Sequence, residues 1–168
     1  MARAYIALGG NLGDPVAQMQ TALTKLSEHP AIHQVRASRY YVTAPVGYDN
    51  QPDFYNAVAE VETTLAANEL LDLMFELEFE GGRERLFANA PRTLDLDLLM
   101  YDQLVSSDPR MILPHPRMHL RAFVLVPLAE LAPTLEMPGI GALTPWLAAC
   151  QDQRIEARQP FFPLPIAS

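Results

Sequence analysis

The order of apolar patterns along the chain predicts an α+β fold with an antiparallel sheet of ferredoxin-like βαββαβ order. Strand and helix patterns follow one another as strand, helix, strand, strand, helix, strand, which is the order of the split βαβ unit. At 168 residues and 49% hydrophobic composition, the chain is long and apolar enough for one compact core. We therefore expect a single domain over residues 1–168, with C-terminal helices after the sheet, one of them near residues 143–149, and an extended tail that runs over the surface.

The first two elements follow from local sequence signals. Residues 4–8 form a short apolar run that is typical of a buried strand. Asp14 is a suitable N-cap and Pro15 a suitable first residue for a helix whose apolar residues recur at helical spacing up to Pro30. The intervening GGNLGD lacks the spacing of a dinucleotide loop or a Walker loop. By motif it is only a strand-to-helix turn.

Two strands are predicted next, over residues 32–43 and 53–63, because both stretches are rich in β-branched and aromatic residues. In the second stretch, Phe54 and Asn56 point to the same face as Val58. An aromatic ring beside an amide could stack on and hydrogen-bond a flat heterocycle. Taken alone, the two residues fit an ordinary strand with a half-buried phenylalanine better.

A second helix is predicted over residues 70–77, where leucines and Met74 recur at helical spacing. Glu78 lies on the apolar side of this helix. A carboxylate in such a place needs a partner, and we expect Arg83 or Arg85 to provide it.

The stretch from 90 to 102 contains two carboxylates within an apolar strand pattern. Because side chains alternate along a strand, Asp95 and Asp97 should share a face with Leu99, while Met100 should point to the opposite face. Two residues of rise place the aspartates about 6.6 Å apart. Mg²⁺ prefers oxygen ligands and commonly takes one or two carboxylates together with substrate phosphates. A bare Asp-x-Asp also fits the solvated face of an ordinary edge strand.

Basic residues gather around this strand although the chain as a whole is acidic. The segment 83–121 contains half of the 12 Lys+Arg residues. Positive charge beside paired carboxylates suits a metal-bound polyphosphate. These six basic residues are Arg83, Arg85, Arg92, Arg110, Arg117 and Arg121.

The remaining composition excludes several classes of protein. A net charge of −8 and a pI near 4.9 argue against general nucleic-acid binding, which needs spread positive charge. Cys150 is the only cysteine, so no intrachain disulfide forms. His115 and His119 are four residues apart, but prolines bracket the first, which disfavours a helical zinc site. The apolar run in MARAYIALGG is too short for a signal peptide, and the sequence contains no run of about 18 apolar residues, so we expect a cytoplasmic protein with no membrane partner.

Five stretches, taken in this order and spacing, resemble hydroxymethyldihydropterin pyrophosphokinase of folate synthesis. The match covers most of residues 4–131, and its most specific part is PRTLDLDLL. The resemblance implies a ferredoxin-like α+β enzyme that transfers the terminal pyrophosphate of ATP to the hydroxymethyl group of a reduced pterin and releases AMP. The five stretches are YIALGGNLGD, SRYYVTAPVGYDNQPDFYNAV, GRER, APRTLDLDLL and LPHPRMHLRAFVLVPL.

The resemblance also implies roles for individual residues. Asp95 and Asp97 match the ligands of two Mg²⁺ ions, ATP is the co-substrate, and Glu78 matches a family acid. The residues implied in pterin binding are Thr43, Val46, Phe54, Asn56 and Phe123. The residues implied around the nucleotide are Arg83, Arg85, Arg92, His115 and Arg121. Arg83 and Arg92 join the two aspartates as the expected catalytic residues, and no general base is assigned.

One loop departs from the family pattern. Where the family has a basic residue, Trp and Gly before Pro-Arg, this chain has Ala88, Asn89 and Ala90. Two other readings stay open at this point: a non-catalytic ferredoxin-like ligand-binding module, and an ATP-dependent transferase with a different acceptor. We expect a monomer that binds the two small-molecule substrates.

Overall fold

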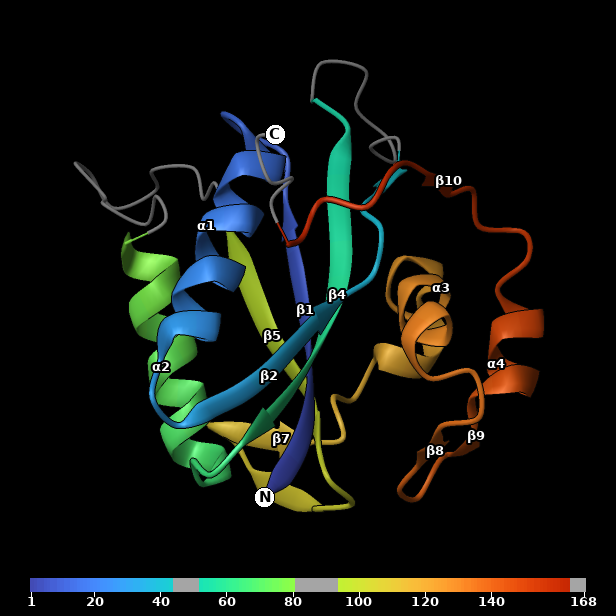
Figure 1. The fold of residues 1–168 in the computed structure, drawn as a ribbon. Coiled ribbons are helices and arrows are strands. Elements are labelled where there is room, and N and C mark those ends of the chain that lie inside the picture. The colour runs from blue at the N-terminus through green and yellow to red at the C-terminus, as the bar shows by residue number, and fades with distance from the viewer. Residues whose placement is uncertain (44–51, 81–93, 164–168) are drawn as a thin grey trace.

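The computed structural model describes residues 1–43, 52–80 and 94–163 (Figure 1). Two layers of helices enclose a central antiparallel sheet in this part of the chain. The helices are α1 (Pro15–Glu28), α2 (Ala67–Glu80), the 3₁₀ helix η1 (Met118–Leu120), α3 (Ala122–Leu131) and α4 (Leu143–Ala149). The strands are β1 (Ala2–Gly10), β2 (Ile32–Ala37), β3 (Tyr41–Thr43), β4 (Phe54–Thr63), β5 (Asp95–Tyr101), β6 (Ser106–Asp108), β7 (Met111–Leu113), β8 (Glu136–Met137), β9 (Gly141–Ala142) and β10 (Glu156–Ala157).

The main sheet, within the described residues, has six strands in the order β10-β3-β4-β1-β5, with β2 also pairing with β4. All of these pairings are antiparallel, as predicted. The long strands β1 and β4 lie at the centre of the sheet. The two neighbours of β1 are therefore β4 and β5, which carry the candidate aromatic–amide pair and the candidate carboxylates.

Helices α1 and α2 cover one face of the sheet (Figure 1). Helix α1 begins as predicted, because the Asp14 side chain accepts a hydrogen bond of 3.1 Å from the Ala17 N–H and Pro15 occupies the first turn. Its apolar side packs against alternate residues of β1 such as Ile6 and Leu8. This packing contributes to one of the two buried clusters of the hydrophobic core.

Helices α3 and α4 cover the other face, where Tyr5 and Val58 of the sheet contact them. C-terminal helices were predicted from the sequence, but without bounds for α3. The apolar residues of α3 hardly segregate to one side, and Pro127 lies inside the helix. Both features obscure the helical pattern in the sequence.

The predicted strand over residues 32–43 is divided into β2 and β3. Ser38 lies at the break, where its N–H donates to the Val58 carbonyl at 2.9 Å and its hydroxyl accepts from the Val58 N–H at 3.0 Å. The side chain thus replaces a backbone acceptor in the ladder. The chain can bend here without leaving a buried donor unsatisfied.

The alternation expected along β5 is correct as far as Leu99 and wrong for Met100. Ile6 of β1 pairs with Leu98, whereas Tyr5 pairs with Met100, so Leu99 is an extra residue in the ladder. A β-bulge of this kind shifts the alternation by one residue. Leu99 and Met100 consequently both pack under α3 and α4.

The C-terminal tail was expected to run over the surface, and this is only partly correct. Strand β10 adds to β3, and the Arg158 N–H donates to the Tyr40 carbonyl at 2.9 Å. Phe161, however, is buried in the core between sheet and α1, and its carbonyl accepts a 3.0 Å hydrogen bond from the Gln20 amide. An aromatic residue thus anchors the tail.

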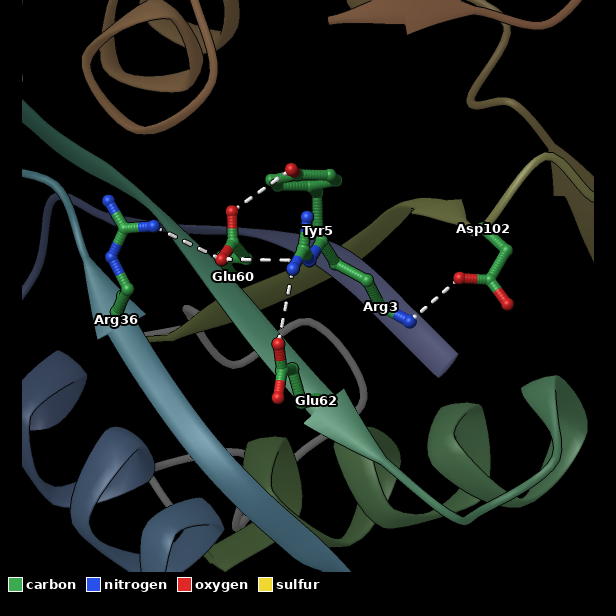
Figure 2. A network of polar contacts seen from close by, with 6 residues as sticks. All are labelled: Arg3, Tyr5, Arg36, Glu60, Glu62 and Asp102. Atoms are coloured by element: carbon green, nitrogen blue, oxygen red, sulfur yellow. Dashed lines mark hydrogen bonds and ion pairs between the residues drawn. The ribbon is translucent and has the colours of Figure 1, made fainter. Parts of the chain in front are cut away.

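A charged network surrounds the nearly buried Glu60 at the end of the sheet where the chain begins (Figure 2). The Tyr5 hydroxyl donates to the Glu60 carboxylate at 3.0 Å, and the Arg36 and Arg3 guanidinium groups lie 3.2 Å and 3.8 Å from it. Burial and the hydrogen bond to Glu60 raise the pKa of Tyr5 to about 12. The network therefore links β1, β2 and β4 through one shared carboxylate.

None of the helices in the described part of the chain combines the length and apolar character that crossing a membrane requires.

Candidate active site

A pocket of about 1050 Å³ opens where β1, β3, β4 and β5 meet the beginning of α3. It lies on the face of the sheet that α3 covers, at the end of β1 opposite to the network of Glu60. Eight residues that the sequence analysis assigned to the site line this one pocket. They are Thr43, Phe54, Asn56, Asp95, Asp97, His115, Arg121 and Phe123.

The two carboxylates enter the pocket from the first half of β5. Asp95 and Asp97 are exposed, while Leu96 between them is buried in the opposite face of the sheet. The Leu96 N–H donates a hydrogen bond of 3.1 Å to Glu78 at the end of α2, and Glu78 is only 4% exposed. Glu78 thus holds the backbone between the two aspartates from the side of the sheet that α2 covers.

The aromatic and amide residues form a second group in the pocket. Phe54, which is 37% exposed, and the half-buried Asn56 come from the beginning of β4, as the strand periodicity predicted. Thr43 pairs with Phe54 across the β3–β4 ladder. Phe123 approaches from the first turn of α3. A flat ring between these residues would meet aromatic and polar surface together.

His115 lies on the carboxylate side of the pocket in a fixed orientation. Its backbone N–H donates to the Leu99 carbonyl at 2.9 Å, and its ring Nδ1 accepts from the Arg117 backbone N–H at 3.2 Å. Because Nδ1 accepts, the neutral ring carries its proton on Nε2. Burial lowers the pKa of His115, Asp97 opposes that effect, and the positive charges of Arg121 and Arg117 lower it further.

Arg121 is the N-cap residue of α3, so its positive charge adds to that of the helix N-terminus. Its guanidinium carbon lies 5.4 Å from the centre of the Phe123 ring, which is within cation–π distance. The backbone on either side of Arg121 is held by Gln153, whose amide accepts from the Ala122 N–H at 2.9 Å and donates to the Leu120 carbonyl at 3.0 Å. This end of the pocket is suited to an anion.

Two parts of the pocket were not predicted from the sequence. Gly9, Gly10 and Asn11 line it, although the GGNLGD stretch was interpreted only as a turn. The glycines were the available signal, since glycine in a strand often marks a close approach. Residues 152–154 also line the pocket, and no spacing or motif in the sequence indicated them.

Some predicted features lie outside the described residues. Among the site residues these are Val46, Arg83, Arg85 and Arg92. The departing loop residues Ala88 and Asn89, and the arginine partner expected for Glu78, lie outside them as well.

Comparison with known proteins identifies the family. Residues 5–133 match the model of the 7,8-dihydro-6-hydroxymethylpterin-pyrophosphokinase family. The chain is 44% identical over 154 residues to the 2-amino-4-hydroxy-6-hydroxymethyldihydropteridine pyrophosphokinase of Pseudomonas aeruginosa, covering 92% of this chain and 95% of that one. The protein of the same name from Haemophilus influenzae is 42% identical over 155 residues, with 92% and 97% covered.

Solved structures show the same fold at low sequence identity. A Plasmodium falciparum HPPK-DHPS triple mutant superimposes with a TM-score of 0.70 at 14% identity, over 88% of this chain. This chain spans 44% of that longer polypeptide. The family match covers well over half of the chain, and the two bacterial relatives are similar along almost their whole length. The chain therefore belongs to the 7,8-dihydro-6-hydroxymethylpterin-pyrophosphokinase family.

Proposed function

We propose that this protein transfers the terminal pyrophosphate of ATP to the hydroxymethyl group of 6-hydroxymethyl-7,8-dihydropterin, giving AMP and the pterin diphosphate, a step of tetrahydrofolate biosynthesis. One observation carries the proposal: a single pocket joins an aromatic–amide surface to a pair of carboxylates and a basic helix terminus. Those are the surfaces that a pterin and a metal-bound triphosphate require. Membership of the family supports the same reaction.

The pterin would occupy the side of the pocket formed by β3, β4 and α3. Phe54 and Phe123 would stack on the ring, and the Asn56 amide would hydrogen-bond its edge. Thr43, and Val46 outside the described residues, would meet the ring from the adjoining loop. An amide that must satisfy specific ring atoms discriminates strongly against heterocycles that lack them.

Asp95 and Asp97 would hold Mg²⁺, and their chemistry fits that ion. Both are hard oxygen donors on one face of β5, and they open into the pocket rather than into the core. Within the described residues, no cluster of three or more His, Cys, Asp and Glu forms a complete protein cage, and Mg²⁺ normally completes its shell with phosphates and water. When bound, Mg²⁺ neutralises charge on the phosphate oxygens. We propose two ions, as the family pattern implies.

The basic residues would bind and orient the triphosphate. Arg121 and the N-terminus of α3 present positive charge to it, and neutral His115 presents an Nε2–H donor. Arg83, Arg85 and Arg92, which lie outside the described residues, would complete this set and stabilise the charge that develops during transfer.

The protein itself contributes mainly position and electrostatics. Transfer requires the pterin hydroxyl to lie in line with the β-phosphorus and the leaving AMP. The hydroxyl would lie between the pterin surface of β4 and the carboxylates of β5. In the described sheet, only strand β1 lies between these two strands. No side chain is assigned as a general base, since phosphoryl-type transfer depends chiefly on alignment and charge stabilisation.

The strand order supports a finer structural proposal. The order β5-β1-β4-β2 with antiparallel neighbours is what a ferredoxin-like split βαβ unit would have. The single domain, the monomeric state and the cytoplasmic location stay predictions. Gel filtration with light scattering would test the monomer.

The reaction is tested by incubating the protein with ATP, Mg²⁺ and the hydroxymethyl pterin and separating the nucleotides by chromatography. We expect AMP only when the pterin is present. ADP instead of AMP would indicate an ordinary kinase, and AMP formed with another hydroxylated acceptor would indicate a different transferase. Pterin binding without any nucleotide product would indicate a non-catalytic module.

A further inference from the structure

Gly9 occupies a special position in the floor of the pocket. It lies near the end of β1, where its cross-strand partners are Asn56 on β4 and Asp95 on β5. All three residues line the pocket. Gly9 therefore lies between the amide assigned to the pterin and a carboxylate assigned to the metal.

A side chain at position 9 would collide with the Asn56 amide. A methyl group placed on the Gly9 Cα would lie 2.8 Å from Asn56 Oδ1 and 3.8 Å from its Cγ. Carbon and oxygen atoms that are not bonded need a separation of at least about 3.5 Å for a favourable contact. The Asn56 carboxamide thus occupies the space that a residue with a Cβ would fill.

The backbone alone does not explain a glycine here. The described glycines with positive φ are Gly13, Gly139 and Gly141, so position 9 does not need the left-handed conformation. Glycine in the interior of a strand weakens it. The remaining physical reason for a glycine at position 9 is that it leaves room for the neighbouring Asn56 side chain.

We propose that Gly9 is a positioning residue for the pterin, because its missing side chain lets the Asn56 amide lie across β1 in the orientation that reads the ring edge. This inference rests on the proposed function and adds a residue to it. Gly9 acts through Asn56 and makes no assigned contact with the reacting atoms.

A double-mutant cycle tests the proposal. Dissociation constants for the pterin and for Mg²⁺–ATP, each measured alone by calorimetry, are compared among the parent, Gly9→Ala, Asn56→Ala and the double variant. We expect Gly9→Ala to weaken the pterin about five- to a hundredfold, the effect of one or two misplaced hydrogen bonds, and to change ATP affinity less than about twofold. In the Asn56→Ala background the same change should alter pterin affinity less than about twofold, since the clash is gone.

Several outcomes would overturn the role of Gly9. These are an unchanged pterin affinity in Gly9→Ala, an equal loss of ATP affinity, and an effect that persists in the Asn56→Ala background. An effect of Gly9→Ala that persists in the Asn56→Ala background would show that the added methyl group obstructs the ligand itself. If Gly9→Ala fails to fold, the clash predicts that the double variant folds again, and unfolding of both would overturn the proposal.

The cycle also separates this inference from the proposed function. Failure of the parent to form AMP contradicts the proposed reaction. An unchanged pterin affinity in Asn56→Ala removes the assignment of Asn56 and the role of Gly9 together. A loss in Asn56→Ala without one in Gly9→Ala removes the role of Gly9 alone.

Discussion

Replacing Tyr5 with phenylalanine should destabilise the fold through the network of Figure 2. The change removes a hydroxyl that donates at 3.0 Å to Glu60, in a place where Tyr5 is 4% and Glu60 7% exposed. A hydrogen bond to a charged group contributes about 1.5–3 kcal/mol. Because Arg36 remains 3.2 Å from the carboxylate, we expect a loss near the lower end of that range, about 1–2 kcal/mol. For a domain of this size that corresponds to a fall in Tm of roughly 2–8 °C.

The effect of Tyr5→Phe should also depend on pH. The folded protein raises the pKa of Tyr5 to about 12 from an ordinary value of 10.0. The folded state therefore holds this proton more tightly than the unfolded state, and the stabilisation is complete below pH 10 and is lost as the pH rises towards 12. The difference in the free energy of unfolding between parent and variant should be constant near neutrality and should shrink above pH 10.

Urea unfolding followed by circular dichroism measures both effects, at neutral pH and in steps above pH 9. Tyr40→Phe is the matched control, because the Tyr40 ring packs against Tyr55 and Phe161. Within the described residues the Tyr40 hydroxyl makes no hydrogen bond. A Tyr5→Phe variant as stable as the control, or a difference that does not shrink in alkali, would refute the reasoning.

Three further predictions concern the pocket. Asp97→Asn should lower Mg²⁺-dependent AMP formation by about a hundredfold or more, because the triphosphate loses a charged clamp; pterin binding and the circular dichroism spectrum should stay unchanged, and near-parental turnover would contradict the metal assignment. The His115 ring, followed by NMR, should titrate below its ordinary value of 6.5. Because the pKa of His115 is lowered in the folded state, the contribution of His115 to stability is present above pH 6.5 and is lost as the pH falls through the lowered pKa. An NMR titration midpoint at or above 6.5 would contradict this prediction. Phe123→Ala should weaken the pterin by about 1 kcal/mol beyond the lost contact area, as fluorescence titration would measure, whereas an equal loss of ATP affinity would indicate that Phe123 acts through its contact with Arg121.

Local sequence signals were sufficient for the elements that depend on near neighbours. Asp14 and Pro15 begin α1 as predicted, because capping and the fixed φ of proline act within one turn. The alternation along β5 placed Asp95 and Asp97 on one exposed face, with Leu96 buried between them. The pocket-lining residues of β4 followed from the same periodicity of two.

Other features depended on contacts between segments far apart in the sequence. The bulge at Leu99 arises from the pairing of β5 with β1, and it reverses the face expected for Met100. Residues 152–154 reach the pocket only because the chain returns past the beginning of α3. The importance of Gly9 likewise appears only when β4 brings Asn56 beside it.

The sequence by itself thus indicated the strand and helix segments as far as β5, the exposed carboxylates and the family, because each depends on residue type and local period. The tertiary structure alone decided which of these residues share one pocket and which small residues must leave room for them. The physical reason is that a strand specifies the direction of its own side chains. The distance between side chains on different strands depends instead on register and on bulges, which are set by packing across the whole sheet.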